Sequence, residues 1–149
     1  MKNQPFIICL IDDDDIYQFT ATRRIEQEKI AKKILVFSEA ENALQFLVDN
    51  IADNENLPDI IFLDLNMPVM DGWEFLEEYT RLKPRLAKRI TLYVVSSSVS
   101  KADIDRAKKI EEVSDYLIKP VSKNMLLTVI NDVLKIQSYS ESQPIAGEK

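Results

Sequence analysis

The stretch FIICLIDDDD, residues 6–15, joins six apolar residues to four consecutive aspartates. An apolar run of this length, without alternation of polar residues, is typical of a strand buried on both faces of a parallel sheet. Aspartate is disfavoured inside strands, and neighbouring carboxylates repel one another. The acids therefore mark the end of the strand, and they need positive charge from elsewhere.

The same kind of apolar run occurs four more times along the chain. These runs are ILVF (34–37), IIFL (60–63), ITLYVV (90–95) and YLI (116–118). Helix-like patterns separate the runs, so strand and helix alternate five times. This alternation predicts an α/β protein with a doubly wound parallel sheet of five strands and helices on both faces.

Helix start signals support this division. Ser38 and Glu41 have the spacing of a capping box, and Ser100 and Ser122 precede the last two helical patterns. A less regular first helix is expected at roughly residues 15–30. We expect Gly72 to supply a positive φ in a turn.

Composition excludes several kinds of active site. With 149 residues the chain fits one domain. The absence of histidine removes Ser-His-Asp and Cys-His nucleophile systems and His-containing zinc sites. Two glycines are too few for a P-loop or a dinucleotide fingerprint. A net charge of -6 argues against a nucleic-acid partner.

The cellular setting is also indicated by composition. Cys9 is the single cysteine and lies in the first apolar run, so we expect a buried thiol in a reducing compartment. No segment is long enough to cross a membrane, and the N-terminal apolar run is a poor signal peptide. These features predict a cytoplasmic protein with no membrane partner.

Polar residues follow four of the five apolar runs. Asp12 and Asp13 follow the first, Asp64 the third, Ser96 the fourth and Lys119 the fifth. Ligands bind beyond the carboxyl ends of the strands in open parallel sheets, so we expect these residues to converge. Three carboxylates would resist ionising together, and Mg²⁺ with the lysine would balance their charge.

Asp14 and Asp15 need a different explanation. They lie where the first helix should begin, and negative charge there meets the unpaired N–H groups and the positive end of the helix dipole. We therefore expect them to cap the helix and not to bind metal.

Four motifs now resemble a known family. LIDDDD, IIFLDLNMPVMDGWEFL, VVSSS and YLIKP resemble, in order and spacing, the receiver domain of two-component response regulators. The resemblance covers about residues 5–136. It implies a (βα)5 flavodoxin-like fold with strand order 2-1-3-4-5. We expect residues 1–136 to form the receiver domain and 137–149 to be a polar, disordered tail.

The resemblance also implies roles for the strand-end residues. Asp64 matches the phosphoacceptor, and Asp12 and Asp13 match the acidic pair that holds Mg²⁺. Asn66 matches the position whose backbone carbonyl completes the metal site, and Lys119 matches the lysine that contacts the phosphoryl group.

Three further residues match positions that carry the signal. Ser96 matches the hydroxyl that bonds the phosphoryl group, and Tyr116 matches the aromatic switch residue that turns from exposed to buried with it. Pro120 matches a proline that shapes its loop through a cis bond. Ser97 stands where the family often has a smaller residue.

The resemblance implies a function in a phosphorelay. A sensor histidine kinase or a histidine phosphotransfer protein would donate the phosphoryl group, and an unknown protein target would receive the signal. The chain would catalyse only its own phosphorylation and dephosphorylation, so it is not expected to be an enzyme in the ordinary sense. We expect a stand-alone receiver without an output domain, as a monomer or weak dimer.

Two alternatives from other classes remain open. A haloacid dehalogenase-like phosphatase also uses a strand-end aspartate with magnesium, but it needs a second aspartate where this chain has Asn66. A pseudo-receiver would be a phosphorylation-independent interaction module, and it would lack Asp13, Asp64 or Lys119.

Overall fold

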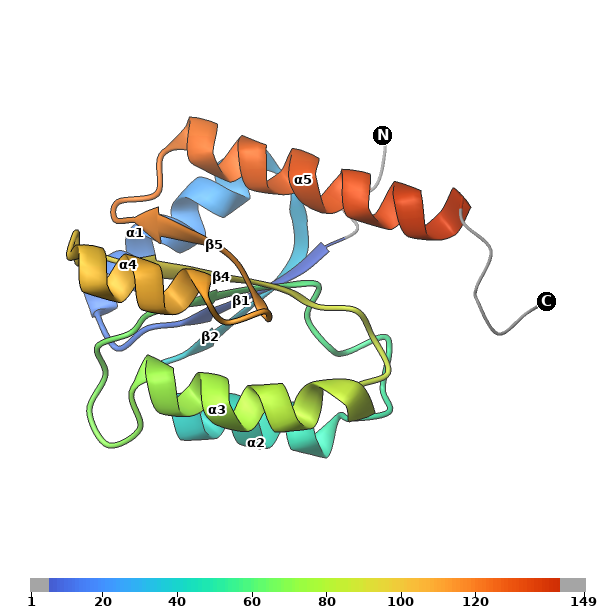
Figure 1. Ribbon diagram of the computed structural model, residues 1–149. Helices are drawn as coiled ribbons and strands as arrows, with labels where there is room; N and C mark the ends of the chain where they lie inside the picture. Colours follow the sequence, from blue (N-terminus) through green and yellow to red (C-terminus); the bar gives the residue numbers. More distant parts are fainter. Residues whose placement is uncertain (1–5, 143–149) are drawn as a thin grey trace.

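Each of the five apolar runs forms a strand of one parallel sheet (Figure 1). The computed structural model describes residues 6–142, with side chains described through Gln137. The strands are β1 (Phe6–Ile11), β2 (Ala31–Phe37), β3 (Ile60–Leu63), β4 (Thr91–Ser96) and β5 (Val113–Ile118). Their order is β2-β1-β3-β4-β5, which confirms the predicted topology.

Helices cover both faces of the sheet, as right-handed crossovers between parallel strands require. The helices are α1 (Asp15–Glu28), α2 (Ala40–Asp49), α3 (Gly72–Leu82), the short 3₁₀ helix η1 (Lys83–Arg85), α4 (Lys101–Lys108) and α5 (Lys123–Ser142). Figure 1 shows α1 and α5 on one face and α2 and α3 together on the other.

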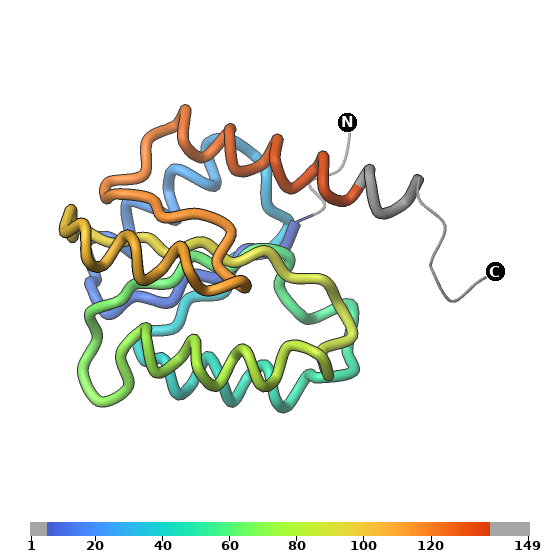
Figure 2. The backbone as a smooth tube through the Cα atoms, in the orientation of Figure 1, coloured from blue at the N-terminus to red at the C-terminus, as the bar shows by residue number. Residues whose placement is uncertain are grey.

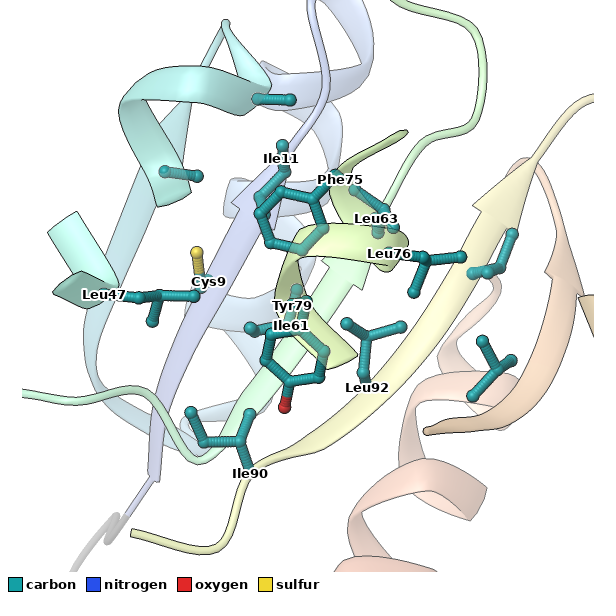
Figure 3. Close-up of a cluster of buried hydrophobic side chains, with 14 of the residues drawn as sticks. Cys9, Ile11, Leu47, Ile61, Leu63, Phe75, Leu76, Tyr79, Ile90 and Leu92 are labelled. Carbon is teal, nitrogen blue, oxygen red and sulfur yellow. The ribbon is translucent and has the colours of Figure 1, made fainter. Parts of the chain in front are cut away.

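The two faces bury separate apolar clusters. On one face, α2 and α3 pack on side chains of the central strands, and Phe75 and Tyr79 of α3 stack with ring centroids 5.9 Å apart (Figure 3). On the other face, residues of α1 and α5 pack against Phe62 and Tyr93. Since β1, β3 and β4 supply both clusters, their runs contain no exposed position.

The two edge strands differ from the central three. Strand β2 begins at Ala31, earlier than its apolar core predicts, and exposes Lys32 and Lys33. Strand β5 begins at Val113 and exposes Ser114 and Asp115. An edge strand pairs on one side only, so polar residues are accommodated there, and an apolar run alone underestimates its length.

One predicted helix cap is wrong. Helix α2 has Glu39 at its N-cap position, without a side-chain cap bond. The Ser38 hydroxyl instead accepts a hydrogen bond of 2.9 Å from Nε2 of Gln18 on α1. By contrast, Ser100 and Ser122 accept the backbone N–H bonds that the sequence predicted for α4 and α5.

The last helix is longer than expected. Helix α5 continues through residues 137–142, which the sequence analysis placed in a disordered tail. In Figure 2 the coloured part of α5 follows one regular helix. The sequence there contains no glycine or proline before Pro144, so nothing stops the helix at residue 136. Residues 143–149 lie outside the described part of the chain.

Helices α3 and α4 meet through a cation and an aromatic ring. The Arg106 guanidinium of α4 lies 4.0 Å from the ring centroid of Trp73 on α3. Arg81 and Ile110 line the groove between these helices. This contact joins Trp73 of α3 to the neighbouring helix.

Candidate functional site

Backbone hydrogen bonds continue past the ends of the strands and bring the polar residues together. The Asp64 N–H donates to the Ile11 carbonyl at 2.9 Å, which places Asp64 beside Asp12. The Lys119 N–H donates to the Ser96 carbonyl, also at 2.9 Å. The sheet register itself therefore gathers the strand-end residues that the sequence analysis identified.

Three carboxylates converge at this edge of the sheet. Oxygen atoms of Asp12, Asp13 and Asp64 all lie within 4.8 Å of one another. Asp12 and Asp64 are buried, whereas Asp13 is exposed at the mouth of the site. Hard oxygen donors with an open side suit Mg²⁺, which takes one or two carboxylates and keeps several waters. The residues present therefore fit the cation that the sequence predicted.

Lys119 supplies positive charge to the same site. Its Nζ lies 2.7 Å from Oδ2 of Asp12 and 3.6 Å from Oδ1 of Asp64. The Lys119 side chain is 15% exposed. A lysine with so little exposure to solvent needs charged partners, and Asp12 and Asp64 are those partners here.

Burial makes the acids costly to ionise. Burial, and then the charge of Asp12, raise the pKa of Asp64 to about 6. Lys119 and the backbone N–H groups of Leu65 and Asn66 oppose this rise in pKa. Burial also raises the pKa of Asp12. One lysine therefore does not balance two buried carboxylates, and the site favours a further cation.

The other two aspartates of the run serve the helix. Asp14 is the N-cap of α1, and its side chain accepts hydrogen bonds from the N–H groups of Ile16 and Tyr17. Asp15 is the acidic residue of the first turn. The structure thus confirms that these two aspartates lie at the start of α1, where Asp14 caps the helix.

Ser96 and Tyr116 are connected through one residue of the loop after β4. The Ser98 N–H donates to the Ser96 hydroxyl at 3.0 Å, and the Tyr116 hydroxyl donates to the Ser98 carbonyl at 2.9 Å. Ser96 is fully buried and Tyr116 is 8% exposed. Tyr116 therefore occupies the buried position that the sequence analysis assigned to the signalling state.

Comparison with known proteins identifies the family. A sequence model of the response regulator receiver domain matches residues 8–131, which include the whole acidic site. The chain belongs to the response regulator receiver family. The alternative of a phosphatase and that of a pseudo-receiver are not favoured by this match.

Individual relatives agree with this assignment. The receiver is 31% identical over 129 residues to the probable methanogenesis regulatory protein FilR2 of Methanothrix harundinacea, covering 87% of this chain and 81% of that protein. It is 31% identical over 140 residues to the sensor histidine kinase CheAY of Helicobacter pylori, covering 91% of this chain but 16% of the kinase.

Solved structures show the same architecture. A two-component response regulator from Cytophaga hutchinsonii matches with a TM-score of 0.77 and 29% identity, covering 87% of this chain and 96% of that structure. The protein is therefore a response regulator receiver domain of two-component systems with the flavodoxin-like fold.

Within residues 6–142, no helix is both long and apolar enough to cross a membrane.

Gly72 of this receiver has a different role from the one predicted. Its φ is not positive, so the expected turn conformation is absent. A Cβ atom at this position would instead lie 2.4 Å from the Asp64 carbonyl oxygen and 2.7 Å from Leu65 Cα. Close approach of α3 to the end of β3 therefore requires the glycine. The left-handed residue of this loop is Val69, with a φ of 69°.

The remaining predicted residues border the site. The Lys119–Pro120 bond is cis, as the resemblance implied. Asn66 is exposed directly beyond Asp64, and its backbone carbonyl as a metal ligand stays a prediction.

Sequence reasoning missed two site residues on α1. The ring of Tyr17 lies 4.5 Å from Lys119 Nζ. The amide of Gln18 donates to the backbone carbonyl of Asp12 as well as to Ser38. Their position in the first turns of α1, directly after the aspartates, was the sequence feature that could have identified them. Whether their side chains reach the site depends on how α1 packs on the sheet. Burial and the charges of Asp12 and Asp64 raise the pKa of Tyr17, so its hydroxyl stays protonated.

Proposed function

We propose that this receiver accepts a phosphoryl group on Asp64, with Mg²⁺ as cofactor, and passes the signal to a protein target. The observation that carries the proposal is the placement of one buried carboxylate, Asp64, beside a second acid and within 3.6 Å of the Lys119 ammonium. Phosphoryl transfer depends mainly on positioning and charge neutralisation, and this arrangement offers both.

The residues divide the chemistry among them. A carboxylate oxygen of Asp64 attacks phosphorus, the bond from phosphorus to the donor breaks, and an aspartyl phosphate remains. Lys119 would offset negative charge on the phosphoryl oxygens, and the Ser96 hydroxyl would donate to one of them. Asp12 and Asp13 would hold Mg²⁺, with the Asn66 carbonyl, and the metal would supply further positive charge. Water can hydrolyse the acyl phosphate, so the signal would end without another enzyme.

A histidine kinase or a histidine phosphotransfer protein is the proposed donor. In that transfer, the bond between phosphorus and the donor imidazole breaks, and the imidazole leaves. The similarity to a receiver segment within a sensor histidine kinase supports a donor of this class. We propose a cytoplasmic location, and a monomer or weak dimer, on the grounds given by the sequence.

The output surface is proposed to lie on α4, β5 and α5. The chain Ser96–Ser98–Tyr116 links the site to β5, and the Ser98 hydroxyl donates to Asp103 of α4 at 2.8 Å. A phosphoryl group that attracts the Ser96 hydroxyl would shift the equilibrium between two arrangements of this loop. The size of the shift is limited by how much more strongly the phosphoryl group interacts with one arrangement than with the other. Tyr116 already lies inward, so the proposed signal is the fixing of this arrangement.

Phosphorylation by acetyl phosphate tests the proposal. Incubation with Mg²⁺ should add one phosphoryl group by intact-mass spectrometry, and hydroxylamine should remove it because it cleaves acyl phosphates. Asp64→Asn should abolish the addition, and a chelator should do the same for the unmodified chain. Matched labelling of the Asp64→Asn variant would refute the assignment of the phosphoacceptor.

A further inference from the structure

The Lys119 ammonium has an aromatic neighbour in addition to its two acids. Its Nζ lies 4.5 Å from the centroid of the Tyr17 ring, well inside the distance of about 6 Å at which a cation and a ring face attract. The same atom is 2.7 Å from Asp12 and 3.6 Å from Asp64. Three groups therefore define the position of this lysine, and only two of them are charged.

The Tyr17 ring is itself held in place. Its backbone N–H donates to the Asp14 carboxylate at 3.2 Å, so the N-cap of α1 fixes the residue that carries the ring. The ring is 9% exposed and belongs to the apolar cluster that includes Ile25, Phe62 and Leu126. A ring anchored by a helix cap and by a packed core offers a rigid face to a flexible side chain.

A lysine needs such support because its charge sits on a long stem with many rotamers. Asp12 and Asp64 attract the ammonium, but each has another proposed partner. Asp12 would bind the metal cation, and Asp64 would attack phosphorus. A neutral ring attracts the ammonium without being used by either. The ring contact therefore stays available when the carboxylates acquire other partners.

We propose that Tyr17 is a positioning residue for phosphoryl transfer, and that its ring face holds the Lys119 ammonium where the phosphoryl oxygens arrive. The inference rests on the proposed function of Asp64. It also implies that Asp14 affects phosphoryl transfer and Asp15 does not, because it is Asp14 that accepts the hydrogen bond from the backbone of Tyr17.

The first test compares phosphorylation rates from acetyl phosphate at saturating Mg²⁺. Tyr17→Leu should lower the rate of Asp64 phosphorylation by about 2- to 30-fold, the range expected from loss of one cation–ring contact. Tyr17→Phe keeps the ring face and should restore a rate close to that of the unmodified chain. Tyr93→Leu is the matched control, since Tyr93 lies in the same apolar cluster as Tyr17 but on β4.

A second test separates the charge distribution of the ring from its volume. In the Tyr17→Phe variant, the phenyl ring is replaced by a 3,4,5-trifluorophenyl ring. This ring has nearly the same shape, but its face carries less negative charge. The phosphorylation rate should fall relative to Tyr17→Phe. An equal rate for the fluorinated and plain rings, or a loss in Tyr93→Leu as large as in Tyr17→Leu, would assign the effect to packing and overturn the inference.

A third measurement needs neither metal nor phosphodonor. The side-chain ammonium of Lys119 is followed by ¹⁵N NMR relaxation, and Tyr17→Leu should make it more mobile while Tyr17→Phe should not. Unchanged mobility in Tyr17→Leu would contradict the inference. If the unmodified chain is never phosphorylated, the proposed function fails, and this measurement still decides whether the ring holds the lysine.

Discussion

At the scale of single residues, Asp64 is a carboxylate that folding makes harder to ionise. Its side chain is 7% exposed, it shares the site with Asp12, and its pKa is about 6 against an ordinary value of 3.8. A nucleophile must be ionised, so the burial of Asp64 opposes the reactive form of this carboxylate. Lys119 and a bound cation would restore the balance.

The raised pKa of Asp64 predicts a dependence of stability on pH. Between about pH 4 and 6 the native state binds more protons than the unfolded state, so the free energy of unfolding should fall as pH rises, and the loss should be complete above pH 6. Without divalent cations, Asp64→Asn should therefore be more stable than the unmodified chain at pH 7, by at most about 3 kcal/mol.

Urea denaturation at several pH values measures this effect. The advantage of Asp64→Asn should shrink toward pH 4, where both side chains are neutral. Asp59→Asn serves as a comparison at the other end of the sheet, where Lys88 lies 3.3 Å from the carboxylate. An Asp64→Asn variant that is less stable than the unmodified chain at pH 7 would show that folding does not penalise this charge.

At the scale of elements, α1 shows how a helix start can organise a site. The cap residue Asp14 begins the helix, and the following turns place Tyr17 against Lys119 and Gln18 against the end of β1. The aspartate run therefore ends one element and begins the next. Both functions follow from local chemistry that was readable in the sequence.

The cap of α1 can be tested by substitution. Asp14→Ala should lower the free energy of unfolding by about 1 kcal/mol relative to Asp14→Asn, because asparagine also caps but has no charge. The comparison between these two variants removes the effect of repulsion from Asp12. Chemical denaturation near pH 7 gives the difference, and equal stability of the two variants would mean that the cap bonds contribute nothing.

Elements also show where prediction from sequence ends. The central strands and the strand-end residues were predictable because a strand buried on both faces is a continuous apolar run, and the polar residues that end it follow directly in the sequence. The role of Ser38 was not predictable, because the side-chain amide that donates to its hydroxyl belongs to Gln18 of α1 and reaches it through tertiary packing. The need for Gly72 has the same origin, since its neighbour is the backbone of β3. Contacts between elements decide such residues.

At the scale of the whole molecule, the acidic site joins the ends of two neighbouring central strands. Asp12 and Asp13 follow β1, and Asp64 follows β3, so a cation bound there contacts the centre of the sheet. A ligand that binds only the folded state stabilises the entire domain, by about 2.7 kcal/mol at a concentration 100 times its dissociation constant. Metal binding should therefore be visible in global unfolding.

Magnesium should raise the melting temperature of the unmodified chain, and the rise should depend on its concentration. Asp13→Ala removes an exposed donor of the site and should abolish the rise, whereas Asp15→Ala should retain it. Thermal denaturation followed by circular dichroism, with Na⁺ at equal ionic strength as control, measures both. Loss of the rise in Asp15→Ala would show that the four aspartates divide differently.

The contact between Arg106 and Trp73 makes the chain its own optical reporter. Trp73 is the single tryptophan of the sequence, and the guanidinium that lies 4.0 Å from its ring belongs to α4, the helix bonded to the loop after Ser96. Indole emission responds to nearby charge and to solvent. A change in the spacing of α3 and α4 can therefore be followed in real time as a change of fluorescence, in unlabelled protein.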